Sequence, residues 1–340
     1  MSLNSLPLED FLRTEGAILD VRSPGEFEQG HLPGALNLPL FSNEERAKIG
    51  TIYKQICPEK AVEEGFKLVG PRLHAFILEA KQLCSPGLGA RIHCWRGGMR
   101  SEFVANILRM AGLTAYTLKG GYKTFRRWTL STLELPLSLK VVGGLTGSGK
   151  TEILKSLKEL GEQTLDLEAF AGHRGSSFGI LGKPPQISHE QFENALAFAI
   201  HHLDHTRPIW LEDESRNLGQ CAIPNQLFFQ MSNAPLFLVE RPITERLAIL
   251  REDYSHFPSE ELCFATQKLK KRLGDVRTQE ICSLFHDQKF DEAVTLLLSY
   301  YDPSYSYTLK KRSQLILRLQ DEGLTNLEWA KKLKDDTKYH

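Results

Sequence analysis

Residues 144–151 read GLTGSGKT, and this stretch constrains the fold more than any other part of the chain. The spacing G-x-x-x-x-G-K-[ST] is typical of a loop that binds phosphate, and such a loop requires a strand before it and a helix after it. The apolar run LKVVG precedes the loop, and the helical pattern EILKSLKEL follows it. The sequence therefore predicts an α/β fold with a phosphate-binding loop between a strand and a helix.

The residue types in this loop suit an anionic ligand. Gly147 and Gly149 let the backbone wrap around phosphate oxygens, Lys150 supplies a positive charge, and Thr151 can ligate Mg²⁺. The motif indicates a bound phosphate or diphosphate, but it identifies neither the compound nor a hydrolysis reaction. The residues expected to bind phosphate are Gly144, Thr146, Gly147, Ser148, Gly149, Lys150 and Thr151.

A metal ion at this loop needs a carboxylate at the end of another strand, and PIWLEDE at 208–214 supplies three. We expect Asp213 to contact the metal or the substrate, with Glu212, Glu214 and Asp166 as rivals, because hard cations prefer oxygen ligands. Acidic residues at a strand end are about as often simply solvated. Mg²⁺ is therefore a candidate ion rather than a predicted one, and no tightly bound cofactor is expected.

A second anion site is indicated by residues 93–101, which read HCWRGGMRS. Cys94 ends the strand-like run GARIHC, and the helix expected from Ser101 directs its positive N-terminus at the same space. Two glycines let backbone N–H groups turn inward, and two arginines add positive charge. These groups lower the pKa of a thiol, so we expect Cys94 to carry an anionic group as a thiolate rather than merely to end a buried strand. The residues expected at this site are the catalytic Cys94, Arg96 and Arg100 and the phosphate-binding Gly97 and Gly98.

Strand and helix patterns alternate along the chain. An apolar run ends at Asp20, TAYTLKGG follows the cysteine loop, and QTLDL, RPIWLED and APLFLVE are later strand candidates, while helix dominates beyond about residue 240. The Pro-containing segment STLELPLSLK separates two halves, which places a domain boundary near 130–138. We expect a doubly wound parallel-sheet domain at 1–130 and a phosphate-loop α/β domain at 138–340 with a helical C-terminal part.

The segment LDVRSPGEFEQGHLPGALNLP, with a cysteine loop between strand and helix, resembles the rhodanese family of sulfurtransferases over about residues 5–128. The resemblance implies a rhodanese-like fold and a cysteine that cycles through a persulfide. Common rhodaneses carry Cys-x4-Arg, whereas five residues separate Cys94 from Arg100 here, and Ser101 follows. The longer loop also fits cysteine phosphatases, including dual-specificity phosphatases built on a rhodanese-like fold. Sulfur transfer and phosphate hydrolysis therefore both stay open on loop length alone.

The order of three motifs across the chain, HCWRGGMRS, GGLTGSGKT and WLEDESRNLG, resembles the tRNA 2-selenouridine synthases, which join a rhodanese-like domain to a P-loop domain and carry the longer cysteine loop. The resemblance implies that a 2-thiouridine at the tRNA wobble position is geranylated from geranyl diphosphate, and that selenium from selenophosphate then displaces the S-geranyl group. It further implies a perselenide on Cys94 and a diphosphate in the loop at 144–151. The implied partners are tRNA, small phosphorylated substrates and a selenophosphate-producing enzyme.

Composition narrows the possible partners. Lys+Arg and Asp+Glu both total 42, so only a local basic face could bind RNA, and candidates lie at 123–128, 268–272 and 309–312. No apolar run is long enough to cross a bilayer, so no membrane partner is expected. The N-terminal residues lack a basic leader, and the six cysteines include no C-x-x-C pair, so we expect free thiols and a cytoplasmic location.

Two weaker signals complete the set of candidates. His173 and Arg174 lie in AGHRGSSFG at 171–179, which suits either a substrate-contacting loop or a simply solvated one. His201 and His205 are one helical turn apart without an H-E-x-x-H pattern, so a surface role is favoured over metal binding.

Two other functions stay open beside 2-selenouridine synthesis. They are a rhodanese-fold cysteine phosphatase and a sulfurtransferase with a regulatory P-loop module.

Overall fold

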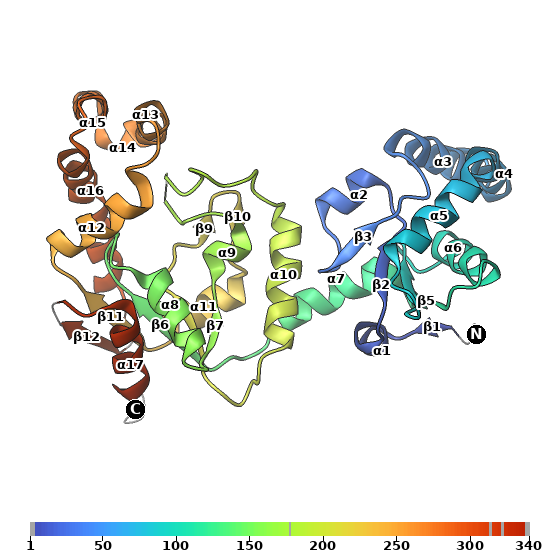
Figure 1. The fold of residues 1–340 in the computed structure, drawn as a ribbon, viewed down its shortest axis with the longest axis horizontal. Helices are drawn as coiled ribbons and strands as arrows, with labels where there is room; N and C mark the ends of the chain where they lie inside the picture. Colours follow the sequence, from blue (N-terminus) through green and yellow to red (C-terminus); the bar gives the residue numbers. More distant parts are fainter. Residues whose placement is uncertain (1–3, 177, 313–314, 321–322, 337–340) are drawn as a thin grey trace. The chain divides into compact units, whose positions relative to one another are not determined.

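The computed structural model describes residues 4–176, 178–312, 315–320 and 323–336. Two compact units make up the chain: Met1–Thr132 with Glu193–Phe198, and Leu133–Phe192 with Ala199–His340 (Figure 1). Each unit contains a five-stranded sheet whose strand pairs are all parallel. The α/β fold with parallel sheets that the sequence predicts is therefore confirmed.

The first unit has the strand order β1-β5-β4-β2-β3. Its strands are β1 (Ser5–Leu6), β2 (Ala17–Asp20), β3 (Ala35–Asn37), β4 (Ala90–His93) and β5 (Ala115–Leu118). Its helices are α1 (Leu8–Arg13), α2 (Pro24–Gln29), α3 (Asn43–Gln55), α4 (Pro58–Val69), α5 (Leu73–Leu83), α6 (Met99–Met110) and α7 (Gly121–Thr132), with the 3-10 turn η1 (Gly70–Arg72) before α5.

Parallel pairing determines where the first unit presents its loops. Because the strands run in one direction, the segments that follow β2, β4 and β5 lie at the same edge of the sheet. Strand β4 lies in the middle, and its residues Ala90 and Ile92 are completely buried in a core that also contains Leu19 and Val104. The cysteine loop therefore starts from a buried central strand of this unit.

The second unit has the strand order β12-β11-β6-β8-β7. Its strands are β6 (Leu139–Gly143), β7 (Gln163–Leu165), β8 (Ile209–Glu212), β11 (Leu236–Glu240) and β12 (Ile316–Gln320), and β9 (Asn217–Leu218) pairs with β10 (Cys221–Ala222) in a small antiparallel hairpin. The helices outside its C-terminal group are α8 (Lys150–Glu159), α9 (Leu167–Ala171), α11 (Asn225–Asn233) and α17 (Asn326–Asp336). Helix α10 (His189–His201) is divided, because its residues Glu193–Phe198 are grouped with the first unit.

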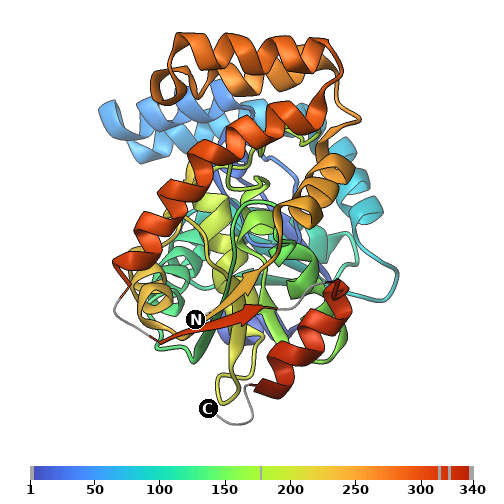
Figure 2. The same cartoon turned by 90° about the vertical axis from the view of Figure 1, so that its left-hand side faces the viewer.

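A helical group lies between β11 and β12, in the part of the chain expected to be mainly helical. It consists of α12 (Ile243–Tyr254), α13 (Ser259–Gln267), α14 (Lys270–Leu273), α15 (Asp275–His286) and α16 (Phe290–Lys310). Its core includes Leu262, Ile281 and Leu297. Figure 2 shows α16 as the long orange-to-red helix that leads from this group back to the sheet, where β12 forms an edge strand. Strand β12 was not predicted from the sequence.

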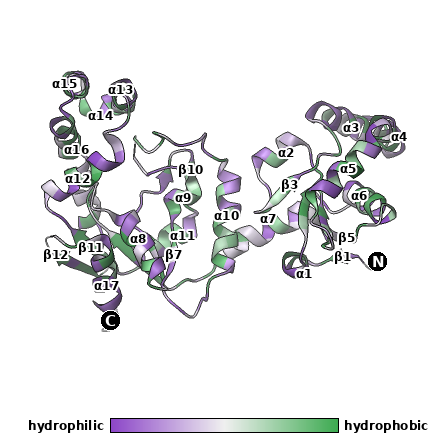
Figure 3. Cartoon of the chain, in the orientation of Figure 1, coloured by the Kyte–Doolittle hydropathy of each residue, from purple (hydrophilic) through white to green (hydrophobic). Residues whose placement is uncertain are grey.

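Hydrophobic residues concentrate on the strands and on the inner sides of the helices of each unit (Figure 3). Completely or almost completely buried side chains include Val141 and Val142 on β6 and Trp210 on β8. Among the described residues, no helix combines the length and the apolar character needed to span a bilayer.

Candidate functional site

Cys94 lies in the loop between β4 and α6, at the carboxyl edge of the first sheet. Helix α6 begins at Met99, slightly before the expected start at Ser101, and Gly98 occupies its N-cap position. The Cys94 sulfur lies 3.3 Å from the Ser101 hydroxyl oxygen, and Cys94 is 3% exposed. A hydroxyl from the first turn of α6 therefore faces the thiol directly.

The pKa of the Cys94 thiol is lowered from its ordinary value. Burial raises it, but this effect is outweighed by the hydrogen bond with Ser101, the positive charge of Arg100 and the backbone N–H groups of Ser101 and Gly98. The Ser101 hydroxyl also donates to the Gly98 carbonyl oxygen at 3.0 Å. Because a hydroxyl carries one proton, it donates either to that carbonyl or to a thiolate. The shift has the direction expected from the sequence.

The two arginines of the cysteine loop have different surroundings. The Arg100 guanidinium donates to the Glu26 carboxylate at 3.1 Å. Glu26 also accepts the Ser23 N–H at the start of α2, so Arg100 connects α6 to α2. Arg96 is exposed and makes no hydrogen bond or ion pair with any described residue. Arg100 is therefore the arginine that acts on Cys94, while Arg96 is free to contact a ligand.

Gly97 allows two loops to meet backbone to backbone. Its φ is +65°, and a Cβ at this position would lie 2.4 Å from the Leu118 carbonyl oxygen. The Tyr122 N–H donates to the Cys94 carbonyl oxygen at 2.9 Å across the same contact. A Cβ on Gly98 would meet nothing within 4 Å. Gly97 is thus needed for packing, and Gly98 is the glycine whose surroundings leave room for an anion.

The phosphate loop connects β6 to α8, as its motif requires. Gly149 is the N-cap of α8 and has a φ of +77°. The Lys150 ammonium donates to the Gly144 carbonyl oxygen at 3.3 Å, and the Thr151 hydroxyl donates to the Glu212 carboxylate at 3.3 Å. A helix N-terminus, an ammonium group and a hydroxyl therefore converge on one loop, which is the arrangement that binds phosphate.

Side chains from α12 and α16 hold the phosphate loop in place. Nε of Arg246 donates to the Thr146 carbonyl oxygen at 2.8 Å. The same guanidinium forms two hydrogen bonds with Asp302, at 2.7 and 2.9 Å. The Gly144 N–H donates to the Tyr305 hydroxyl at 3.1 Å. The helical group thus fixes two peptide groups of the loop.

The middle of the phosphate loop packs against α12. Gly147 has a φ of +82°, and a Cβ there would lie 2.8 Å from Leu250. Ser148 is 1% exposed, and its hydroxyl oxygen has no hydrogen-bond partner within the part of the chain that the structure describes. Packing against α12 therefore requires a glycine at position 147, whereas Ser148 is simply buried in the loop.

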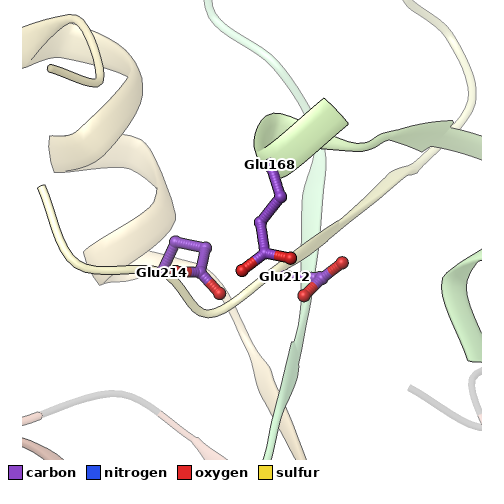
Figure 4. A group of neighbouring side chains, drawn as sticks. All are labelled: Glu168, Glu212 and Glu214. Carbon is purple, nitrogen blue, oxygen red and sulfur yellow. The ribbon is translucent and has the colours of Figure 1, made fainter. Parts of the chain in front are cut away.

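Three glutamates gather beside the phosphate loop, with their carboxylates close together (Figure 4). Glu168 comes from α9, Glu212 ends β8, Glu214 follows it, and oxygens of all three lie within 4.8 Å of one another. Burial raises the pKa of each of the three carboxyl groups. The negative charge of Glu214 raises the pKa values of Glu168 and Glu212 further, whereas the positive charge of Lys150 lowers all three pKa values. Glu212 is 1% exposed, and its Oε1 has no described hydrogen-bond partner. Such an oxygen-rich group suits a hard divalent cation.

Asp213, the acid preferred on sequence grounds for metal or substrate contact, has other partners. Its carboxylate accepts hydrogen bonds from a tyrosine of α16 at 2.8 Å and from Arg312 at 2.9 Å. Successive side chains of an extended strand point to opposite sides, so Glu212 and Glu214 share one side and Asp213 takes the other. The expected metal contact therefore fits Glu212 and Glu214 better. Asp166, the remaining rival, caps α9 by accepting a backbone N–H.

Residues 137–335 match the sequence model of the tRNA 2-selenouridine synthase AAA domain, and residues 7–127 match that of the rhodanese-like domain. The chain belongs to the tRNA 2-selenouridine synthase family. A protein of that name from Marinobacter nauticus is 36% identical, over 92% of this chain and 94% of that protein. Two other proteins of the same name are also similar. The one from Aeromonas salmonicida is 38% identical over 88% of this chain and 90% of that protein, and the one from Proteus mirabilis is 36% identical over 93% of this chain and 95% of that protein. The solved structure of the N-terminal domain of a Clostridium difficile 630 protein is also similar. The match has 38% identity, covers 37% of this chain and 98% of that domain, and has a TM-score of 0.36.

In this member of the synthase family, His173 and Arg174 are packed against other parts of the second unit. His173 is 7% exposed, burial lowers its pKa, and a Cβ on Gly219 would lie 2.7 Å from its ring. Arg174 pairs with Asp253 at 3.6 Å. The neighbouring Gly175 reaches the carboxylates instead, since a Cβ there would lie 2.6 Å from an oxygen of Glu214. Substrate contact by His173 and Arg174 stays a prediction.

Two acids that lie at these sites, Glu26 and Glu168, were not predicted from the sequence. Glu26 could have been found from the S-x-x-E spacing of Ser23 and Glu26, which is typical of a capping box and is present at the start of α2. Its contact with Arg100 depends on tertiary structure. Glu168 had no comparable signal, because only the folding of α9 brings its carboxylate to Glu212.

Proposed function

We propose that this chain is a tRNA 2-selenouridine synthase that replaces the sulfur of 2-thiouridine at the tRNA wobble position by selenium. The observation that carries the proposal is the Cys94 thiol, whose pKa is lowered by Ser101 and Arg100 in spite of burial. A thiolate is the form of cysteine that takes part in thiol–disulfide exchange, through which selenium can be loaded onto the sulfur. The chain also contains a phosphate loop that suits a diphosphate substrate.

In the first step, the sulfur of 2-thiouridine attacks C1 of geranyl diphosphate. A carbon–sulfur bond forms, the carbon–oxygen bond breaks, and diphosphate leaves with the electron pair. Lys150 and the N–H groups at the start of α8 are placed to stabilise the departing negative charge. This step belongs to the loop at 144–151.

Mg²⁺ fits the same loop and would neutralise charge on the diphosphate. The Thr151 hydroxyl and the unpartnered, buried Oε1 of Glu212 are the groups that suit it best, with Glu168 and Glu214 alongside.

Mg²⁺ is expected to increase the affinity for geranyl diphosphate, and Glu212→Gln is expected to remove most of that increase. Calorimetry with and without Mg²⁺ measures the affinity in each case. Glu159→Gln, an exposed acid on α8, is the matched control. Equal affinity with and without Mg²⁺ in the wild type would rule out this role.

In the second step, selenium carried by Cys94 attacks C2 of the S-geranylated uridine, and geranylthiolate leaves. Alkylation makes this exchange feasible, because a thioether sulfur leaves more readily than a thione sulfur. Selenium in selenophosphate is at the selenide level, so it attacks the Cys94 sulfur of a disulfide that Cys94 forms with a small thiol. The sulfur–selenium bond forms, the sulfur–sulfur bond breaks, and the small thiolate leaves with the electron pair. Water then takes the phosphoryl group, phosphate leaves, and Cys94 carries the perselenide. After transfer, the small thiol attacks the Cys94 sulfur, the sulfur–selenium bond breaks with its electron pair going to selenium, and the disulfide on Cys94 forms again. The buried sulfur suits a carrier whose terminal selenium meets the substrate.

Nucleoside analysis of tRNA incubated with the protein, geranyl diphosphate and selenophosphate tests the proposal. S-geranylated 2-thiouridine is expected first and 2-selenouridine later. Cys94→Ser is expected to abolish selenation and to spare geranylation, whereas Lys150→Ala is expected to reduce geranylation first. Mass spectrometry of the Cys94 peptide should show one added selenium atom before tRNA is supplied.

Other outcomes would favour the alternative functions. Release of phosphate from aryl phosphates, with tRNA nucleosides unchanged, would indicate a cysteine phosphatase. Unchanged activity in Cys94→Ser would exclude every function that uses this thiol, including sulfur transfer.

A further inference from the structure

Trp95 follows Cys94 directly and is 37% exposed. Of the other tryptophans, Trp210 and Trp329 are at most 1% exposed, and Trp128 is partly buried. A tryptophan ring that keeps more than a third of its surface in solvent beside a reactive thiol leaves apolar area that a ligand can cover, because burial of such a ring is strongly favourable. The position of Trp95 therefore points to a ligand that covers its ring when the site is in use.

Buried groups hold the Trp95 ring in a defined position. Its centroid lies 5.6 Å from that of Tyr122, and the Arg22 guanidinium lies 5.9 Å from it. Arg22 in turn is fixed by a buried ion pair with Asp20. The Lys123 N–H donates to the Trp95 carbonyl oxygen at 3.0 Å. The ring is thus supported from inside the unit, so a ligand need not order it on binding.

Three exposed cations lie near Trp95, either next to it in the chain or on the segment whose backbone contacts the cysteine loop. Arg96 follows Trp95, and Lys119 precedes Gly120, whose N–H lies near the Cβ position of Gly97. Lys123 lies in the first turn of α7, and its backbone N–H contacts Trp95. In the described structure, the charged groups of Arg96, Lys119 and Lys123 make no hydrogen bond or ion pair. Their charge is therefore available to a phosphate backbone.

We propose that Trp95 with Arg96, Lys119 and Lys123, here called the Trp95 surface, binds a nucleotide of the RNA substrate beside Cys94. The ring stacks on an unpaired base, and the three cations contact phosphates, which is how proteins recognise single-stranded loops of RNA. This inference rests on the proposed function and adds the residues that present the RNA to the thiol. It also gives the two arginines of the cysteine loop different roles. Arg100 acts on Cys94, and Arg96 contacts the RNA.

The test compares Trp95→Ala with Trp95→Phe in the full chain, by tRNA affinity at one fixed salt concentration. Trp95→Ala is expected to weaken binding roughly ten-fold through lost stacking, while Trp95→Phe stays within about three-fold of the wild type. Arg96→Ala, Lys119→Ala and Lys123→Ala should each lower the salt dependence of binding by about one unit of slope. Lys54→Ala, an exposed lysine on α3, is the control and should change neither quantity.

A second measurement excludes a merely structural effect. The rate at which iodoacetamide alkylates Cys94 without RNA should be the same in Trp95→Ala and in the wild type. If Trp95→Ala binds tRNA as tightly as the wild type, or if Cys94 alkylation falls together with affinity, the inference is overturned. A surface that served a protein partner would likewise leave the tRNA affinity of every variant unchanged.

The outcomes for the inference and for the proposed function can be told apart. If the wild type binds tRNA through Trp95 but never forms 2-selenouridine, the proposed function fails and the RNA surface stands. If the wild type and Trp95→Ala both form 2-selenouridine with equal KM for tRNA, the surface fails and the proposed function stands.

Discussion

The reactivity of Cys94 depends on two neighbouring groups that can be removed one at a time. Arg100→Ala and Ser101→Ala are each expected to raise the pKa of Cys94, because both groups favour the thiolate. Only the thiolate is alkylated, so the rate rises as pH increases through the pKa. The midpoint of the pH-rate profile with iodoacetamide should therefore move to higher pH in both variants. Mass spectrometry of the Cys94 peptide separates this signal from the other cysteines.

Arg96→Ala is the matched control for Arg100→Ala. It removes the same charge from the same loop, but Arg96 is exposed and lacks the Glu26 contact. Its effect on the midpoint should be clearly smaller. Equal shifts in Arg96→Ala and Arg100→Ala would show that the fold does not distinguish the two arginines.

The two glycines of the cysteine loop are expected to differ in their tolerance of a side chain. Gly97→Ala combines a φ of +65° with a Cβ 2.4 Å from the Leu118 carbonyl oxygen. The backbone conformation alone is expected to cost about 1–3 kcal/mol in free energy of unfolding. Gly98→Ala has open space and should change it by less than about 0.5 kcal/mol. Urea unfolding of both variants measures the difference, and a smaller loss in Gly97→Ala than in Gly98→Ala would contradict this packing.

At the scale of elements, α16 contributes a tyrosine to the phosphate loop. Tyr305→Phe leaves the Gly144 N–H and one Asp213 oxygen without their partner, so we expect a loss of about 1–3 kcal/mol in free energy of unfolding. Geranyl diphosphate should also bind more weakly, because the loop is less firmly held. Urea unfolding and calorimetry measure these two effects.

Tyr307→Phe provides the control on the same helix. Tyr307 is 62% exposed, so removing its hydroxyl should change the free energy of unfolding by less than about 0.5 kcal/mol. Identical stability and diphosphate affinity in both tyrosine variants would mean that α16 does not support the loop.

The elements that could be predicted from the sequence are those with local signals at both ends. The segments β4–loop–α6 and β6–loop–α8 each have an apolar run, glycines and a helical pattern in immediate succession. Strand β12 has half-exposed residues and Arg318 in its middle, as suits an edge strand, so its pattern is not distinctive. Glu168 joins Glu212 and Glu214 only through tertiary structure, and no spacing along the chain indicates that contact.

At the scale of the whole molecule, the two anion sites belong to separate units. Cys94, Ser101, Arg100 and Glu26 all lie in the first unit, and the phosphate loop with its carboxylates lies in the second. Each unit has its own sheet and its own core. The proposed reaction has two chemical steps with different leaving groups, so each step can be assigned to one unit. Cys94→Ser and Lys150→Ala then impair different steps.

Mixing these two variants tests the assignment directly. Cys94→Ser should produce S-geranylated tRNA, and Lys150→Ala, with geranylation reduced about 100-fold, should still selenate it. Neither variant alone then forms much 2-selenouridine from 2-thiouridine. A mixture of the two variants should form 2-selenouridine if the S-geranylated tRNA is released between the two steps. Isolated S-geranylated tRNA supplies the control, because Lys150→Ala should convert it without a partner. If Lys150→Ala leaves that tRNA unchanged, the phosphate loop is needed for selenation too, and the two steps cannot be divided between the units.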